Sequence, residues 1–115
     1  MIYTNYLREL KKHVKIYIEF FDYVEGDFMP CEMMCGDRAT DVHHIQRRGM
    51  GGSKTKDYIE NLAGLCRDCH MKAESDPMFN MFVRIKHLEN VCNQVYAKIE
   101  YEKINKEYEA KKNTD

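Results

Sequence analysis

The chain has 115 residues, enough for one domain with a modest core, and its 18 basic and 19 acidic residues nearly cancel. That balance excludes an overall positive field, so any contact with a polyanion has to come from a local patch. The sequence shows neither an apolar signal core nor a run of roughly 20 apolar residues, so we expect a soluble cytoplasmic protein without a membrane partner.

The N-terminal segment, residues 1–25, has the pattern of an amphipathic helix. Its apolar side chains recur every three or four positions between residues 5 and 24, namely Leu7, Leu10, Val14, Tyr17, Ile18, Phe21 and Val24. Thr4 and Asn5 are suitable N-caps. The stretch VKIYIEFF also alternates, so a strand is the alternative interpretation.

The middle segment, residues 26–76, is expected to hold short strands and one short helix. The turn-rich stretch EGDFMPCEMMCGDRATD leaves room only for short strands, and TDVHHI is interpreted as the second of them. Residues 46–57, QRRGMGGSKTKD, form a polar, glycine-rich loop. The stretch NLAGLCRDCHMKAE then leads into a short helix.

Residues 77–112 are predicted to form a long C-terminal helix. Asp76 and Pro77 are a typical N-cap and first helical residue. An apolar stripe follows at a spacing of three and four: Met81, Ile85, Leu88, Cys92, Val95 and Ile99. We expect this stripe to cover the core or, as about two and a half heptads, to pair with a second copy, so a monomer and a homodimer are both open.

Four of the five cysteines form two short-spaced pairs, CEMMC and CRDC. Such pairs converge on tetrahedral zinc from two sides, so Cys31, Cys35, Cys66 and Cys69 are predicted to hold a structural Zn²⁺. The alternative is that they are small buried apolar residues. Three residues separate Cys31 from Cys35 where two are commoner, so either the loop bulges or another ligand replaces one of the two.

The histidines suggest a second metal site. His70 and Glu74 are one helical turn apart, and His43 approaching from a strand completes a set for a divalent ion with open positions. His44 points to the other face of the strand, where a neutral imidazole is suited to take a proton from water. Asp41 shares the face of His43 and either fixes its tautomer or is an ordinary turn residue.

The loop between His44 and Asn61 carries the densest basic run near these histidines, made up of Arg47, Arg48, Lys54 and Lys56. Its glycines allow backbone amides to approach a phosphate closely. We interpret the run as a phosphate-binding or DNA-binding patch that offsets the neutral overall charge. A flexible solvated loop is the alternative.

The order of these motifs resembles the HNH endonuclease family, which belongs to the His-Me finger, or ββα-metal, nucleases. The matching residues run from Cys31 to about Glu74 and read CEMMCGDRATDVHHI and ENLAGLCRDCH. The resemblance implies one small α+β domain over residues 1–115. Its ββα-metal core would carry a structural zinc knuckle and be flanked by the N-terminal helix and the long C-terminal helix.

The resemblance also implies a role for each matching residue. His44 matches the histidine that activates the attacking water, and His43 matches the metal-ligand position before it. Asn61 matches the central asparagine, which braces the loop in some members and touches the metal in others. His70 matches the final histidine ligand, and Glu74 falls where another branch has a further histidine ligand.

The implied chemistry is hydrolysis of a nucleic-acid phosphodiester, of DNA rather than RNA, with one catalytic Mg²⁺, Mn²⁺, Ni²⁺ or Zn²⁺. Members of this size occur in phages, mobile introns, toxins and restriction systems, so a phage or bacterial origin is expected. One alternative is a non-catalytic zinc-knuckle module that binds nucleic acid or protein. Another is a thiol redox protein built on the Cys66–Cys69 pair.

Overall fold

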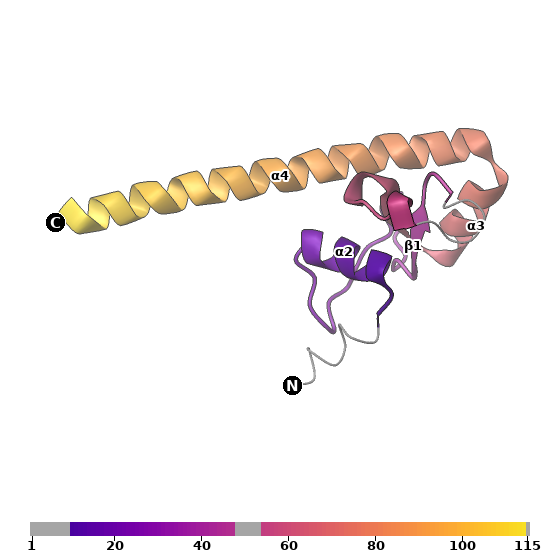
Figure 1. The fold of residues 1–115 in the computed structure, drawn as a ribbon, viewed down its shortest axis with the longest axis horizontal. Coiled ribbons are helices and arrows are strands. Elements are labelled where there is room, and N and C mark those ends of the chain that lie inside the picture. The colour runs from indigo at the N-terminus through magenta and orange to yellow at the C-terminus, as the bar shows by residue number, and fades with distance from the viewer. Residues whose placement is uncertain (1–9, 48–53, 115) are drawn as a thin grey trace.

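The computed structural model describes residues 10–47 and 54–114. Within these ranges the elements are α2 (Lys12–Phe20), β1 (Asp41–His44), 3-10 turns at Lys54–Lys56 and Ile59–Asn61, β2 (Leu62–Leu65), α3 (Arg67–Ser75) and α4 (Pro77–Thr114). Figure 1 shows that α4 runs along one side of the folded core and extends far beyond it. The predicted small α+β fold with a long C-terminal helix is confirmed.

The two strands form an antiparallel hairpin-like sheet with α3 directly after it. Asp41 pairs with Leu65 and His44 pairs with Leu62. The DVHH segment is therefore the first strand of this sheet, and its interpretation as a second strand was wrong. Over residues 26–40 the pairing is limited to one isolated bridge between Pro30 and Arg38. This segment turns through Gly26 and Gly36, both at positive φ, and so cannot continue as a ladder.

Strand β2 is the centre of the core, because all four of its residues are buried. Tyr17 of α2 lies across Gly64 so closely that a Cβ at this position would be 2.5 Å from the tyrosine Oη. Only glycine allows this contact. Helix α2 therefore covers β2 on one side, while α3 and α4 contact it as well.

Helix α2 ends at Phe20, earlier than the expected end at residues 24–25. Asp22 adopts a left-handed φ of 59°, and the Tyr23 amide donates back to the carbonyl of Ile18 at 2.9 Å. Lys98 of α4 donates to the Phe20 carbonyl at 3.0 Å. The helix thus closes with a left-handed turn and a cationic cap from a distant element. The suggested N-caps, Thr4 and Asn5, lie outside the described residues.

Helix α4 begins as predicted, because Oδ1 of Asp76 accepts hydrogen bonds from the amides of Met78 and Phe79. At 38 residues it is about 57 Å long. No helix among the described residues is long and apolar enough to cross a membrane.

The face of α4 that packs on the core differs from the predicted apolar stripe. The buried residues are Val83, His87 and Val91. Members of the predicted stripe are exposed instead, including Met81, Ile85, Cys92, Val95 and Ile99. The expectation that this stripe covers the core, with Cys92 inside, was wrong. Polar side chains on the true packing face are held by hydrogen bonds, which an apolar pattern does not reveal.

Those hydrogen bonds converge on Glu32, which is buried. Its Oε2 accepts from the Tyr17 hydroxyl at 2.8 Å and from the Gly64 amide at 2.7 Å. Its Oε1 accepts from Nδ1 of His87 at 2.8 Å and from Nδ2 of Asn90 at 2.9 Å. One carboxylate therefore joins α2, β2 and α4 inside the core.

His87 and Glu32 form a buried ion pair. Nε2 of His87 donates to the Ile59 carbonyl at 2.6 Å, so both ring nitrogens act as donors. Burial by itself lowers the pKa of His87, but the hydrogen bond and the charge of Glu32 outweigh it and raise that pKa. Burial likewise opposes the charge on Glu32, yet His87 and Asn90 lower the pKa of the carboxyl. The pair fixes the position of α4 over the sheet.

Candidate functional site

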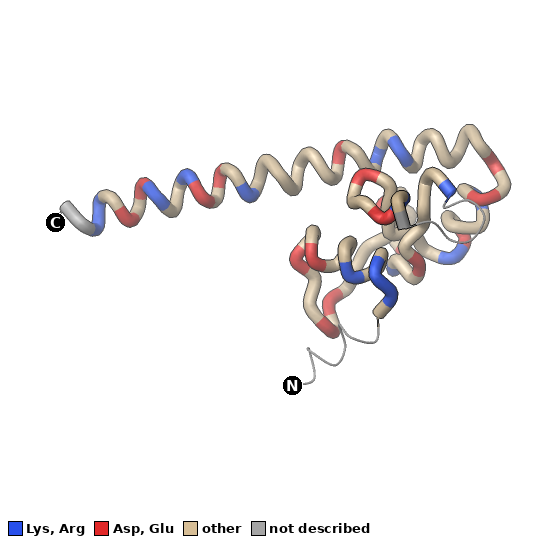
Figure 2. Tube along the Cα trace, viewed as in Figure 1, with Lys and Arg blue, Asp and Glu red and all other residues tan. Residues whose placement is uncertain are grey.

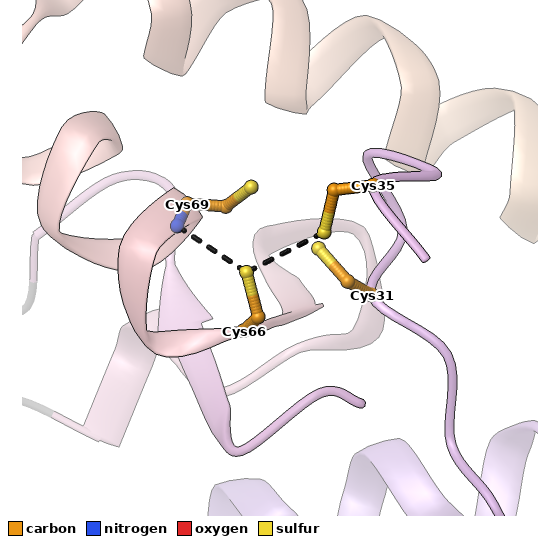
Figure 3. A group of neighbouring side chains, drawn as sticks. All are labelled: Cys31, Cys35, Cys66 and Cys69. Atoms are coloured by element: carbon orange, nitrogen blue, oxygen red, sulfur yellow. Dashed lines mark hydrogen bonds between the residues drawn. The ribbon is translucent and has the colours of Figure 1, made fainter. Parts of the chain in front are cut away.

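The four predicted cysteines meet in one cluster. Cys66 is the N-cap of α3, Cys69 lies in its first turn, and Cys31 and Cys35 come from the loop between α2 and β1. Their sulfur atoms all lie within 4.8 Å of one another, and those of Cys35 and Cys66 are 3.5 Å apart. Figure 3 shows the four side chains pointing toward a common centre.

The unusual spacing of the first pair is accommodated by a bulge. Met34 adopts a left-handed φ of 58°, and its amide donates to the Cys31 carbonyl at 3.1 Å. The tight turn brings Cys35 back toward Cys31 despite the additional residue. Both cysteines therefore stay in the cluster, and no substitute ligand is needed.

The thiols of this cluster suit a zinc ion. Burial raises the pKa of Cys31 and of Cys69, so these thiols hold their protons unless a cation stabilises the thiolates. Zn²⁺ supplies that charge, and four cysteines in two pairs match its tetrahedral preference. The cluster is consistent with a structural zinc knuckle.

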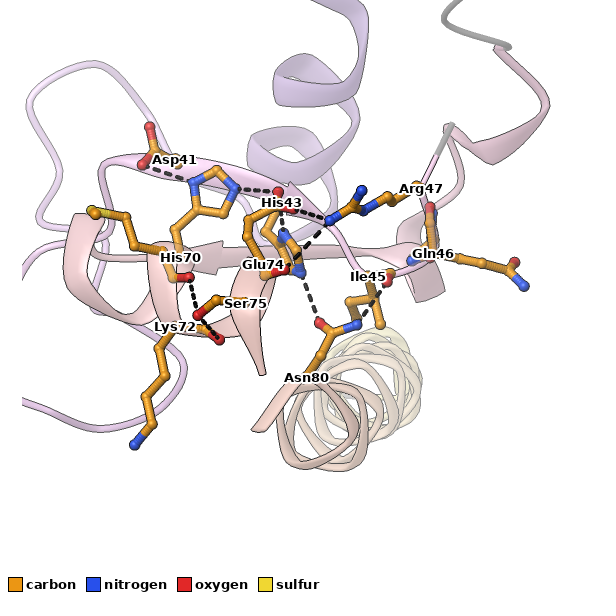
Figure 4. A network of polar contacts seen from close by, with 12 residues as sticks. Asp41, His43, Ile45, Gln46, Arg47, His70, Lys72, Glu74, Ser75 and Asn80 are labelled. Atoms are coloured by element: carbon orange, nitrogen blue, oxygen red, sulfur yellow. Dashed lines mark hydrogen bonds and ion pairs between the residues drawn. The ribbon is translucent and has the colours of Figure 1, made fainter. Parts of the chain in front are cut away.

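A second group of donors comprises His43 of β1 with His70 and Glu74 of α3. The donor atoms lie within 4.8 Å of one another. Nε2 of His43 donates to Oδ1 of Asn80 at 2.8 Å, and Nδ2 of Asn80 donates to the Ile45 carbonyl at 2.9 Å. Because the second bond fixes the asparagine amide, the first fixes the His43 tautomer. Its Nδ1 lone pair then faces the other two donors (Figure 4).

His70 is oriented in the same way by a carboxylate. Its Nδ1 lies 3.1 Å from Oδ2 of Asp41, and its Nε2 lies 3.2 Å from Oε1 of Glu74. A ring that donates to Asp41 presents a lone pair to the Glu74 oxygen, and two lone pairs need a cation or a proton between them. Asp41 thus orients a histidine, but the histidine is His70 and not His43 as expected.

These residues fit a divalent cation. Nδ1 of His43 is buried without a hydrogen bond, 3.6 Å from the Glu74 carboxylate. An imidazole nitrogen without a partner at this depth is costly unless it has a ligand. Glu74 is 45% exposed, so one side of the group is open to solvent and substrate. Such openness distinguishes a catalytic metal site from a closed structural one.

His44 lies on the opposite face of β1, as strand alternation predicts. Its Nε2 is 2.8 Å from Oδ1 of Asp57, whose side chain has no exposed surface. The ring centroid of His13, from α2, lies 4.7 Å from that of His44. Neither His13 nor Asp57 was identified from the sequence, because nothing local distinguishes them from a helix residue and a loop charge.

Comparison with known families agrees with this geometry. Residues 31–76 match the model of the HNH endonuclease family. Residues 31–76 are thus an HNH endonuclease domain. A nucleic-acid substrate is implied by that family. The searches of curated proteins and of solved structures found no significant match.

Asn61 of the HNH domain is buried and braces the loop between the strands. Its Oδ1 accepts from the Gln46 amide at 2.7 Å, while its Nδ2 donates to the carbonyls of Gln46 and Lys56 at 3.0 Å each. Among the two roles that the resemblance allows, the contacts favour bracing. Asn61 holds together the two ends of the loop that carries Asp57.

The basic residues of the HNH domain are only partly described. Arg47 is 77% exposed, and its guanidinium lies 3.4 Å from the Glu74 carboxylate. Lys56 donates to Oε1 of Gln46 at 2.9 Å. Arg48 and the side chain of Lys54 lie outside the described residues. Figure 2 shows Lys and Arg interspersed with Asp and Glu along the C-terminal half of α4, so no long basic stripe follows that segment.

Proposed function

We propose that this protein is a metal-dependent endonuclease that hydrolyses phosphodiester bonds in DNA. The observation that carries the proposal is the division between two neighbouring residues of β1. His43 joins His70 and Glu74 in one group of metal donors, and His44 faces the buried carboxylate of Asp57 on the other side of the strand. A cation on one side and a base on the other suit an in-line displacement, in which the nucleophile and the leaving group lie on opposite sides of phosphorus.

His43, His70 and Glu74 would hold the catalytic ion. When bound there, a divalent ion supplies positive charge that stabilises the charge developing on the phosphate and the departing 3′-oxygen. Two imidazoles favour Mn²⁺, Ni²⁺ or Zn²⁺, while the carboxylate also admits Mg²⁺. Asn80 and Asp41 keep the two histidines oriented as ligands.

His44 is proposed as the general base that takes the proton from the attacking water. Asp57 orients its ring through the 2.8 Å contact with Nε2, as the aspartate of a catalytic triad positions its histidine. Asn61 acts indirectly, because it holds the loop that delivers Asp57. Asn61 is thus a positioning residue.

Substrate contacts are proposed for the basic loop. Arg47, exposed beside Glu74, can reach a phosphate bound at the metal donors. Arg48, Lys54 and Lys56 belong to the same proposed patch and supply local charge in a chain of nearly neutral overall charge. The thiols of the cysteine cluster suit a reducing cytoplasm.

The oligomeric state is a separate proposal. The protein is either a monomer, in which the apolar stripe of α4 stays exposed, or a homodimer, in which the stripes of two copies pair. Sedimentation velocity distinguishes the two.

A non-catalytic zinc-knuckle module is less well supported. Such a module needs the four cysteines, but it has no use for a buried imidazole nitrogen aimed at two further donors. A redox role for Cys66 and Cys69 is also disfavoured, because both sulfurs lie in a group of four.

Incubation of plasmid and single-stranded DNA with the purified protein tests the proposal, with Mg²⁺, Mn²⁺, Ni²⁺ or Zn²⁺ added in turn. We expect nicking or cleavage with at least one ion and none in chelator. Intact DNA under every condition, with zinc retained in the cysteine cluster, would favour the binding module.

A further inference from the structure

A third group of metal donors lies on the far face of β1. It combines His13 of α2, His44 of β1 and Asp57 of the loop before the second 3-10 turn. One ring nitrogen of each histidine and one carboxylate oxygen lie within 4.8 Å of one another. His13 and His44 are partly buried, the Asp57 side chain is fully buried, and the three come from different parts of the chain. His13 lies outside the segment that matches the HNH family.

The chemistry of this group favours a transition-metal ion of the zinc class. Two imidazoles and one carboxylate are the ligands of many three-residue zinc sites, whereas Mg²⁺ prefers oxygen ligands throughout. Orienting His44 requires Asp57 alone. The His13 ring, 4.7 Å from that of His44 and inclined to it by 50°, adds a third donor that such a pair does not need.

We propose that His13, His44 and Asp57 form a third metal site, which binds Zn²⁺ and thereby inhibits the nuclease. A neutral imidazole has only one nitrogen lone pair, so an ion held by either ring nitrogen of His44 leaves none to accept a proton from water. Zn²⁺ at this position therefore blocks the reaction whichever ion occupies the His43 donors. The inhibitory part rests on the proposed function of His44, whereas the ion site itself does not.

Equilibrium dialysis of the full chain against Zn²⁺, followed by elemental analysis, tests the site. The three donor groups found among the described residues predict three zinc ions per chain. His13→Gln is expected to bind one zinc ion fewer than the wild type. His70→Ala is also expected to bind one fewer, because it loses the His43 site, and the double variant is expected to bind two fewer. Because loss of an outer partner alone costs 10–100-fold in metal affinity, loss of His13 is expected to weaken zinc binding at this site at least about 100-fold.

Two further variants keep this result interpretable. Lys12→Gln, on the exposed part of the same helix, should bind as many ions as the wild type. His13→Asp supplies a carboxylate oxygen in place of the imidazole nitrogen and is expected to recover part of the binding. If His13→Gln binds as much zinc as the wild type, the site does not exist. The site is also ruled out if His13→Gln loses zinc only together with its helical circular dichroism signal and His13→Asp recovers no zinc binding.

Inhibition is measured separately, by titrating Zn²⁺ into reactions supported by Mg²⁺ or Mn²⁺. Each variant is compared with its own activity before zinc is added. Zinc is expected to suppress cleavage by the wild type and by Lys12→Gln, and to do so only at much higher concentration with His13→Gln. Equal inhibition of all three proteins would overturn the regulatory role. A wild type without nuclease activity would refute the proposed function, while the zinc count would still decide the site.

Discussion

Oδ1 of Asn80 lies 2.8 Å from Nε2 of His43, although 37 residues separate them in the chain. This contact links the first turn of α4 to the proposed catalytic metal site and selects the ring nitrogen that faces the ion. The long helix therefore takes part in building the site.

Asn80→Ala should consequently weaken binding of the catalytic ion by about 10–100-fold, the usual effect of losing a partner that orients a metal ligand. Calorimetric titration with Mn²⁺ measures the affinity. Asn93→Ala, at an exposed position of the same helix, is the matched control. Equal affinities for the two variants would show that Asn80 does not orient His43.

Removal of one cluster cysteine should release the structural zinc. Cys35 and Cys92 are both exposed, but only Cys35 belongs to the cluster. Cys35→Ser is expected to lower the zinc content by one ion per chain and to lower the melting temperature, because metal binding and folding are coupled. Cys92→Ser should leave both unchanged. A Cys35→Ser protein with full zinc content and unchanged melting temperature would argue against the four-cysteine site.

Stability should fall as pH rises because of His87. Glu32 raises the pKa of this histidine above its ordinary 6.5, so its contribution is complete below pH 6.5 and is lost as pH rises through the folded-state value. Tyr17, Tyr23 and Glu60 are the other titratable groups that act on this pair. Tyr17 and Tyr23 stay neutral throughout this range, because their pKa values are raised by burial and by Glu32.

Urea unfolding of the wild type and of His87→Gln, with zinc present and at several pH values from 6 upward, measures this contribution. The variant should be less stable by about 3–5 kcal/mol at pH 6, because Glu32 loses its buried partner. The difference between the two proteins should shrink as pH rises. A difference that is constant with pH would mean that His87 is not charged in the folded state.

Asn61→Asp should loosen the loop between the strands. The substitution replaces the Nδ2 donor with an oxygen that faces the carbonyls of Gln46 and Lys56. We expect a loss of about 1–3 kcal/mol in the free energy of unfolding, as for unsatisfied buried polar groups. Nuclease activity should fall as well, since the loop carries Asp57. Denaturant unfolding and cleavage rates check both, with Asn105→Asp on exposed α4 as the control. A variant with wild-type stability would rule out the brace.

The parts of the site that the sequence predicts are those that follow from local spacing. Strand alternation separates His43 from His44, and helical periodicity brings Glu74 beside His70. The paired cysteines predict their own cluster, and Asp76 predicts the start of α4. Each of these inferences needs only the geometry of one element.

The sequence does not predict contacts between elements that are distant in the chain. Asp57, His13 and Asn80 reach the histidines only because the loop, α2 and α4 pack around β1. The packing face of α4 was also missed, because it is held by the buried Glu32–His87 pair and not by an apolar stripe. Periodicity identified the exposed side of that helix.

The most direct test of the central claim is the cleavage rate of His44→Ala, measured with saturating metal beside the wild type. The His43 donor set and the cysteine cluster do not include His44, so the variant should keep the ions of both while losing about 10²–10⁴-fold in rate. A variant that retains these ions and its helical content, yet cleaves DNA at the wild-type rate, would contradict the assignment of His44 as the general base.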